Sequence, residues 1–206
     1  MSVVKEGDMA CSALHLLIAE EYCKRHGIEQ VDTFLTGAIL PDIQQDKVSS
    51  HYGVKKRPTS VKEALEYKID IVKCVESIDF NKDSDRSVFL HLLTDYIYYN
   101  YLYKESLEVS NMAKLIKDID NDAGVMTNEI LAKYSFNIPE EFNYLLVPKR
   151  NNGSYVLFPE DKVDNFVEVL STMDLDQAKN EIIVNANDFI ANCLNKINNS
   201  ENVSVG

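Results

Sequence analysis

The sequence predicts a mainly α-helical protein that forms one domain, a multi-helix bundle with one small β-hairpin. Three observations support this prediction: apolar residues recur with helical spacing along most of the chain, helix-ending residues separate these stretches, and only one short region has a β-strand pattern. The chain has 206 residues, of which 45% are hydrophobic, so it is long enough to bury a sizeable core.

Four helices are expected in the N-terminal half. The first ends at Gly27, because glycine is common just past a helix C-terminus, and the second runs into Pro41. Ser60 and Glu63 form a capping box that starts the third. A polar loop is expected between the second and third helices. The helix ranges are about 9–26, 31–40, 60–77 and a helix that begins at residue 84 or 85, and the loop covers 46–59.

The C-terminal half contains four further periodic stretches and the only β pattern. Two short segments, 144–147 and 155–158, have strand character and flank an Asn-Asn-Gly sequence that is typical of a turn. This predicts a β-hairpin near residues 144–158. The helices are expected at about 105–119, 124–135, 160–171 and 175–197, and residues 198–206 form a flexible tail.

Composition argues against several classes of partner and location. The formal net charge of -12 gives no long-range attraction to nucleic acid or to an anionic membrane. The first fifteen residues lack the apolar stretch of a secretory signal, and no run of 18 apolar residues occurs. We therefore expect a cytoplasmic protein whose four cysteines, which lack C-x-x-C spacing, are free thiols.

The most informative residues for function are His91 and Asp95, in the segment VFLHLLTDYIYY. Residues four apart lie on one face of a helix, and this helix is apolar on every side, so both side chains are expected to be buried together. A buried carboxylate is costly unless it is paired. An arginine, a hydrogen-bond network or a metal ion could be its partner, and an H-x3-D pair alone does not choose between them.

Three residues upstream are also of metal-ligand type, and each has a structural interpretation as well. His15 lies in an apolar helix, where it could be a core histidine bonded to a carbonyl. Asp42 follows a proline and could be a turn or cap residue. His51 lies in the polar loop, where a histidine is exposed by default. The metal interpretation requires all three to converge on the pair in the apolar helix.

In its order and context, this set resembles the zinc-dependent phospholipase C and single-strand nuclease superfamily, especially its small, uncharacterised bacterial hydrolase branch. The most specific strings are G-A-I-L-P-D, which ends in Asp42, and H-L-L-T-D, which runs from His91 to Asp95. The resemblance covers about residues 9–100. It implies a metal-site half at about 9–104, followed by a C-terminal helical part at about 105–197.

The resemblance also implies a role for each residue. His51, His91 and Asp95 match the ligands of one metal ion. His15 matches a ligand of a neighbouring ion that Asp95 bridges, and Asp42 matches the acidic residue that orients or deprotonates the attacking water. We therefore expect one or two divalent ions, with zinc best suited to these donors and iron or manganese as alternatives.

The sequence departs from the family after the H-x3-D helix. Family members with three metals place a further His/His/Glu set there, and this chain has no histidine after His91. That metal is either lost or held by carboxylates. The carboxylates available are Glu105, Glu108, Asp118 and Asp122.

The expected activity is hydrolysis of a phosphoester by a metal-activated water, because zinc lowers the pKa of bound water to about 7. Lys55, Lys56 and Arg57 follow the loop histidine and could hold the phosphate of a phosphorylated small molecule, although such runs are often only a solvated loop edge. Tyr98 and Tyr99 could line the pocket or pack in the core. Acyl or amide chemistry on the same scaffold, or a non-catalytic helical protein with a structural metal, are the alternatives.

Overall fold

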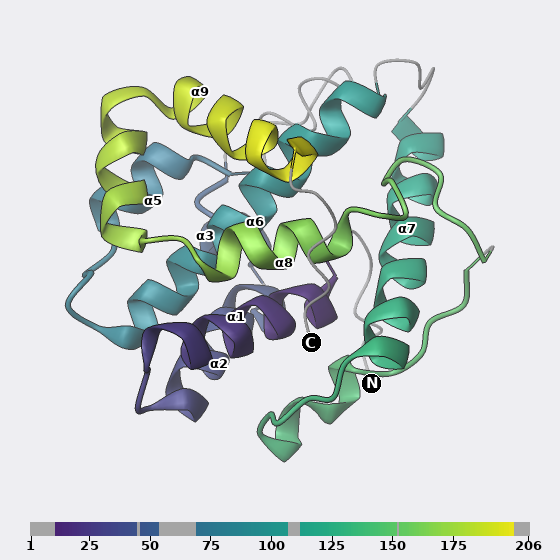
Figure 1. Ribbon diagram of the computed structural model, residues 1–206, viewed down its shortest axis with the longest axis horizontal. Coiled ribbons are helices and arrows are strands. Elements are labelled where there is room, and N and C mark those ends of the chain that lie inside the picture. The colour runs from purple at the N-terminus through teal and green to yellow at the C-terminus, as the bar shows by residue number, and fades with distance from the viewer. Residues whose placement is uncertain (1–10, 45, 54–68, 107–111, 152, 200–206) are drawn as a thin grey trace.

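The computed structural model describes residues 11–44, 46–53, 69–106, 112–151 and 153–199, and within these ranges the chain is helical (Figure 1). The mainly α prediction is confirmed. The helices are α1 Ser12–His26, α2 Val31–Ile43, α3 Lys47–Ser50, α5 Ile71–Ser77, α6 Asp83–Ser106, α7 Met112–Lys133, the 3-10 helix η1 Glu140–Leu145, α8 Val163–Ser171 and α9 Leu175–Asn199.

The two helices that carry the predicted histidines lie at the centre of the molecule. Helix α1 contacts α2, α6, α7 and α8, whereas α6 contacts α1, α2, α5 and α9. In Figure 1, α8 crosses in front of α6, the bent α9 runs along the left and top of the view, and α7 stands on the right. Both helices are buried on most faces, as their all-round apolar composition predicts.

Helix α1 ends as predicted and α2 does not. Gly27 adopts the left-handed conformation, with φ 64°, and its N–H bonds to the carbonyl oxygen of Cys23, which closes α1. The prediction that α2 stops before Pro41 was wrong, because the helix continues to Ile43. Proline has a helix-compatible φ, but it removes the hydrogen bond to the carbonyl of Gly37 and its ring crowds that carbonyl, so other contacts must stabilise this end of α2.

Two other helix boundaries differ from those predicted. Asp70 caps α5 by accepting the N–H of Lys73, so residues 69 and 70, which were expected to be helical, are not, and α5 begins at Ile71. Its expected start at Ser60 and Glu63 lies outside the described residues. In the C-terminal half, α7 is one helix where two were predicted, and Gly124 lies in its middle. A Cβ at this position would lie 3.2 Å from the carbonyl oxygen of Arg150, so the glycine allows a loop to approach the helix closely.

The predicted β-hairpin near residues 144–158 was wrong, since the described part of this region contains no strand. Its polar backbone groups bond to α7 instead of to each other. The buried carboxylate of Asp122 accepts the backbone N–H groups of Val156, Leu157 and Phe158, each at 2.7 Å. Asn128 bonds to both the backbone N–H and the carbonyl oxygen of Lys149. Side chains of α7 therefore satisfy backbone groups that a partner strand would satisfy in a hairpin.

Helices α2 and α6 approach each other closely at Gly37. A Cβ there would lie 1.9 Å from the Oγ atom of Ser87 and 2.6 Å from the carbonyl oxygen of Ser84. Only glycine fits this contact. The close approach brings the C-terminal end of α2, with Asp42, towards His91, one turn further along α6.

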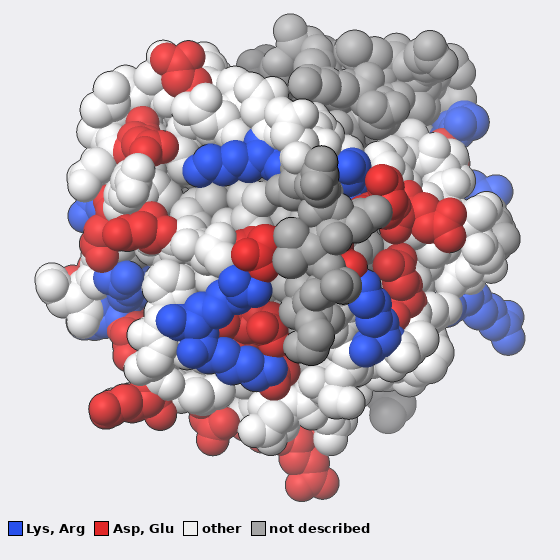
Figure 2. All heavy atoms as spheres, in the orientation of Figure 1, with Lys and Arg blue, Asp and Glu red and all other residues white. Residues whose placement is uncertain are grey.

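The surface mixes charges of both signs. Figure 2 shows lysine and arginine side chains lying between aspartates and glutamates on the visible face. Arg25 pairs with Glu168 in this way, and Arg86 pairs with Asp176. Among the helices of the described residues, none has the length and hydropathy needed to cross a membrane.

Candidate metal centre

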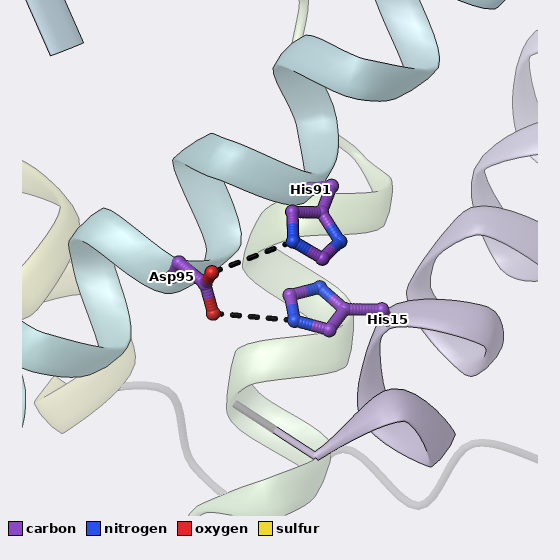
Figure 3. A group of neighbouring side chains, drawn as sticks. All are labelled: His15, His91 and Asp95. Atoms are coloured by element: carbon purple, nitrogen blue, oxygen red, sulfur yellow. Dashed lines mark ion pairs between the residues drawn. The ribbon is translucent and has the colours of Figure 1, made fainter. Parts of the chain in front are cut away.

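Helix α6 places His91 and Asp95 on one face, and α1 brings His15 against them (Figure 3). The carboxylate of Asp95 lies beside the edges of both imidazoles. Its Oδ2 atom is 3.4 Å from Nε2 of His91, and its Oδ1 atom is 3.2 Å from Nε2 of His15. The two rings stack with their centroids 3.8 Å apart, so both ring nitrogens are held beside the carboxylate.

His51 and Asp42 approach the same place from the other side. His51 lies directly after α3, and its Nε2 atom is 3.3 Å from Nε2 of His91 and 3.5 Å from Oδ2 of Asp95. The Oδ1 atom of Asp42, near the end of α2, is 3.8 Å from Nε2 of His51 and 3.9 Å from Nε2 of His91. The five side chains that were expected to converge therefore do so: His15, Asp42, His51, His91 and Asp95.

All five side chains are buried, with at most 3% of any of them exposed. His51 is therefore not the exposed loop residue that its polar surroundings suggested. Two groups of these side chains could each hold a metal ion, and they share one histidine. The groups are His15 with His91 and Asp95, and Asp42 with His51 and His91.

Hydrogen bonds on the outer side of two imidazoles determine which nitrogen carries the proton. The Nδ1 atom of His91 lies 2.7 Å from the carbonyl oxygen of Ala38. A carbonyl can only accept, so Nδ1 donates, and in the neutral imidazole Nε2 keeps a lone pair. The Nδ1 atom of His51 lies 2.9 Å from Oγ of Ser50, whose hydroxyl donates to the carbonyl oxygen of Pro41 at 3.0 Å. The Oγ atom of Ser50 therefore accepts the hydrogen of Nδ1. The lone pair of neutral His51 is then on Nε2, which faces His91 and Asp95.

The electrostatic consequence is that two nitrogen lone pairs and two carboxylates face one small volume. Burial raises the pKa of the Asp95 carboxyl, but the imidazoles of His15, His51 and His91 oppose this and hold the pKa well below its usual range. Burial lowers the pKa of His91, but the negative charges of Asp42 and Asp95 raise it by more, so the net shift of this pKa is upward. Burial and the neighbouring His91 lower the pKa of His15. The cluster is therefore arranged to attract positive charge.

Of the five residues predicted to bind substrate, the structure describes only Tyr98 and Tyr99. Lys55, Lys56 and Arg57 lie outside the described residues. Tyr98 and Tyr99 are both buried, and Tyr98 stacks on Phe158 with ring centroids 5.6 Å apart, which is core packing.

The carboxylates suggested as replacements for the family's missing metal set do not join the cluster where they are described. Asp122 binds the backbone N–H groups of residues 156–158, and Asp118 pairs with Lys114. The side chains of Glu105 and Glu108 lie outside the described residues.

Two contributors to the site were not identified from the sequence. Ser50 precedes His51 directly and could have been considered as its hydrogen-bond partner. The carbonyl oxygen of Ala38, which accepts from His91, could not have been identified from the sequence, because a backbone acceptor has no sequence pattern of its own.

Comparison with known proteins gives no relative: no family model, no curated protein and no solved structure matches the chain. No comparison therefore supports the resemblance to the phospholipase C and nuclease superfamily, which stays a prediction from the sequence.

Proposed function

We propose that this protein is a metal-dependent hydrolase, with a phosphoester as its substrate, and that His51, His91 and Asp95 hold the ion. The observation that carries this proposal is the spacing of three ligand atoms, Nε2 of His51, Nε2 of His91 and Oδ2 of Asp95. They lie 3.3, 3.4 and 3.5 Å from one another. Two ligands bonded at about 2.1 Å to one tetrahedral ion lie about 3.4 Å apart.

A hydrogen-bonded network of protonated histidines and carboxylates, without a metal ion, fits these distances less well. Charge-assisted hydrogen bonds between an imidazolium and a carboxylate are about 2.7 to 2.9 Å long, whereas the nitrogen–oxygen distances here are 3.4 and 3.5 Å. Metal-bound histidines also characteristically donate their other N–H to a carbonyl, as His91 does to Ala38. Both features favour a cation over a purely hydrogen-bonded network.

The donor set favours a catalytic zinc ion. Structural zinc sites are mostly built from cysteines, whereas catalytic sites use histidines and carboxylates and keep a position for water. None of the four cysteines belongs to either ligand group found among the described residues. Iron or manganese could take the same nitrogen and oxygen donors.

A second ion would be held by His15 and Asp95. The two carboxylate oxygens of Asp95 point to different imidazoles, with Oδ1 towards His15 and Oδ2 towards His91 (Figure 3). The Oδ2 atom also lies 3.5 Å from Nε2 of His51. A carboxylate divided in this way can bridge two ions, and His15 would be a ligand of the second. We therefore propose one or two ions in each molecule.

The proposed chemistry depends on Asp42. A bound zinc ion supplies hydroxide near neutral pH, because it lowers the pKa of its water to about 7. Asp42 stands slightly further back than the other donors, at 3.8 and 3.9 Å from two of them. Its carboxylate would accept the proton of the attacking water as a general base, or complete the ligand set. Lys55, Lys56 and Arg57 would hold the phosphate of a small phosphorylated substrate.

One observation favours a second candidate, a helical protein with a structural metal. The ligand side chains are almost fully buried, and Asp42 could fill the fourth position of a closed site. A closed ion stabilises the fold without activating water. Acyl or amide substrates would use the same open ion as phosphoesters, so a substrate panel separates those two activities.

Metal analysis followed by a substrate panel tests these proposals. The purified protein is expected to contain about one or two zinc ions per chain, and His91→Ala is expected to contain none. The metal-loaded protein is then assayed on p-nitrophenyl phosphate, bis-p-nitrophenyl phosphate, phosphatidylcholine and p-nitrophenyl acetate, with the chelator-treated protein as control. Hydrolysis of a phosphoester that chelation abolishes supports the hydrolase. A tightly bound ion with no turnover on any substrate supports the structural role, and a protein that binds no divalent ion overturns both.

A further inference from the structure

Ser50 connects two parts of the candidate metal centre. It is the last residue of α3, and its Oγ atom lies 2.9 Å from Nδ1 of His51 and 3.0 Å from the carbonyl oxygen of Pro41. Pro41 directly precedes Asp42 near the end of α2. A single hydroxyl therefore links the histidine to the helix end that carries the proposed base.

The acceptor on α2 is available because of its position in the helix. The last four carbonyl groups of a helix have no partner within it, and Pro41 is the third residue from the end of α2. The hydroxyl of Ser50 satisfies this carbonyl. Its single proton is then committed, so its oxygen can only accept from His51.

We propose that Ser50 is a positioning residue that selects the metal-binding form of His51. By accepting from Nδ1–H, it leaves the lone pair on Nε2, the atom that lies 3.3 Å from Nε2 of His91. Without this acceptor, Nε2 can carry the proton instead, and that form cannot bind metal through Nε2. The inference rests on the proposed metal site and adds a residue that contacts neither ion nor substrate.

The test compares Ser50→Ala and Ser50→Thr with the wild type in zinc affinity, measured by competition with a chromogenic chelator. Changes to the partner of a metal-bound histidine typically cost about 10- to 100-fold in affinity, so we expect a loss of this size for Ser50→Ala. Ser50→Thr keeps the hydroxyl and is expected to restore most of the affinity. Ser49→Ala is the matched control, because Ser49 is exposed and its hydroxyl bonds to Asp46, away from the cluster.

A nitrogen NMR measurement separates positioning from a general loss of structure. In metal-free protein with ¹⁵N-labelled histidine, His51 of the wild type is expected to show a protonated Nδ1, with the signal assigned through His51→Gln. In Ser50→Ala, the proton is expected to move largely to Nε2 while the helical circular dichroism is unchanged. An unchanged proton position, or an unchanged zinc affinity in Ser50→Ala, overturns the inference about Ser50. Absence of zinc binding by the wild type overturns the proposed metal site instead.

Discussion

The imidazole of His91, on α6, donates from Nδ1 to the carbonyl oxygen of Ala38, on α2, over 2.7 Å. This contact joins the two helices at the place where both contribute to the candidate metal centre. It fixes the plane of the ring and leaves Nε2 facing Asp95, at 3.4 Å from Oδ2. The position of this candidate ligand is therefore determined by the packing of α2 on α6 as well as by its own helix.

His91→Ala is expected to abolish metal binding and any hydrolase activity together. It removes one of the three proposed ligands, and His91 also belongs to both groups of side chains that could hold an ion. The variant should also lose stabilisation by zinc. An ion at 100 times its dissociation constant stabilises a folded protein by about 2.7 kcal/mol. Thermal unfolding with and without zinc measures this difference. His26→Ala, which changes an exposed histidine at the end of α1, should keep the full zinc-induced shift. A shift that survives in His91→Ala would contradict the proposed ligand set.

Asp42→Asn is expected to keep most of the metal and to lower turnover. The amide has nearly the same shape but cannot accept a proton from water, and loss of a general base typically costs about 10²- to 10⁴-fold in rate. The measurements are metal content and kcat on the substrate that the panel identifies. Asp32→Asn makes the same chemical change at an exposed position of the same helix and should leave both values unchanged. Full activity in Asp42→Asn would remove the residue from the mechanism.

Periodicity and residue order predicted the central helices and the convergence of the five candidate ligands, since these depend on local patterns. His15, His91 and Asp95 were placed in buried helices because their neighbours are apolar on every side. The prediction for residues 144–158 failed because Asp122 is distant in sequence and still satisfies three of their backbone N–H groups. A side chain that replaces a partner strand cannot be recognised from a strand pattern.

The α2 boundary failed for a related reason. Pro41 was interpreted as a helix stop, but the helix continues to Ile43, where packing of α2 on α6 outweighs the loss of one hydrogen bond. Gly37 lies in the same helix, and its missing side chain permits this packing. The tertiary contact, which the sequence alone does not show, therefore decided the boundary.

Gly37→Ala is expected to destabilise the protein by about 1 to 3 kcal/mol, the usual cost of overpacking. Helix propensity alone would favour the alanine by about 1 kcal/mol, so the sign of the change tests the contact. The new Cβ would lie 1.9 Å from Oγ of Ser87 and 2.6 Å from the carbonyl oxygen of Ser84, which forces α2 away from α6. Urea unfolding measures the free energy of unfolding. Zinc titration should show weaker binding, because the Ala38 carbonyl that orients His91 moves with α2.

The control for this variant is the double variant Gly37→Ala/Ser87→Ala. It removes the hydroxyl but leaves the backbone carbonyl of Ser84, so it should recover only part of the lost stability. If Gly37→Ala instead raised the free energy of unfolding, the close approach of α2 and α6 would be wrong.

The four cysteines are all free, as predicted, and their thiols are expected to react very slowly in the folded protein. All four are buried, and burial raises the pKa of each thiol, to about 12 for Cys23 and for Cys193. Because the thiolate is the reactive form, a raised pKa lowers reactivity at a given pH. At pH 8 a thiol with a pKa near 12 is ionised to about 1 part in 10⁴, against roughly a quarter for an ordinary cysteine. Titration with an aromatic disulfide reagent should detect almost no thiol in the native protein and all four in denaturant. Rapid reaction of one or more thiols under native conditions would show that this part of the core opens readily.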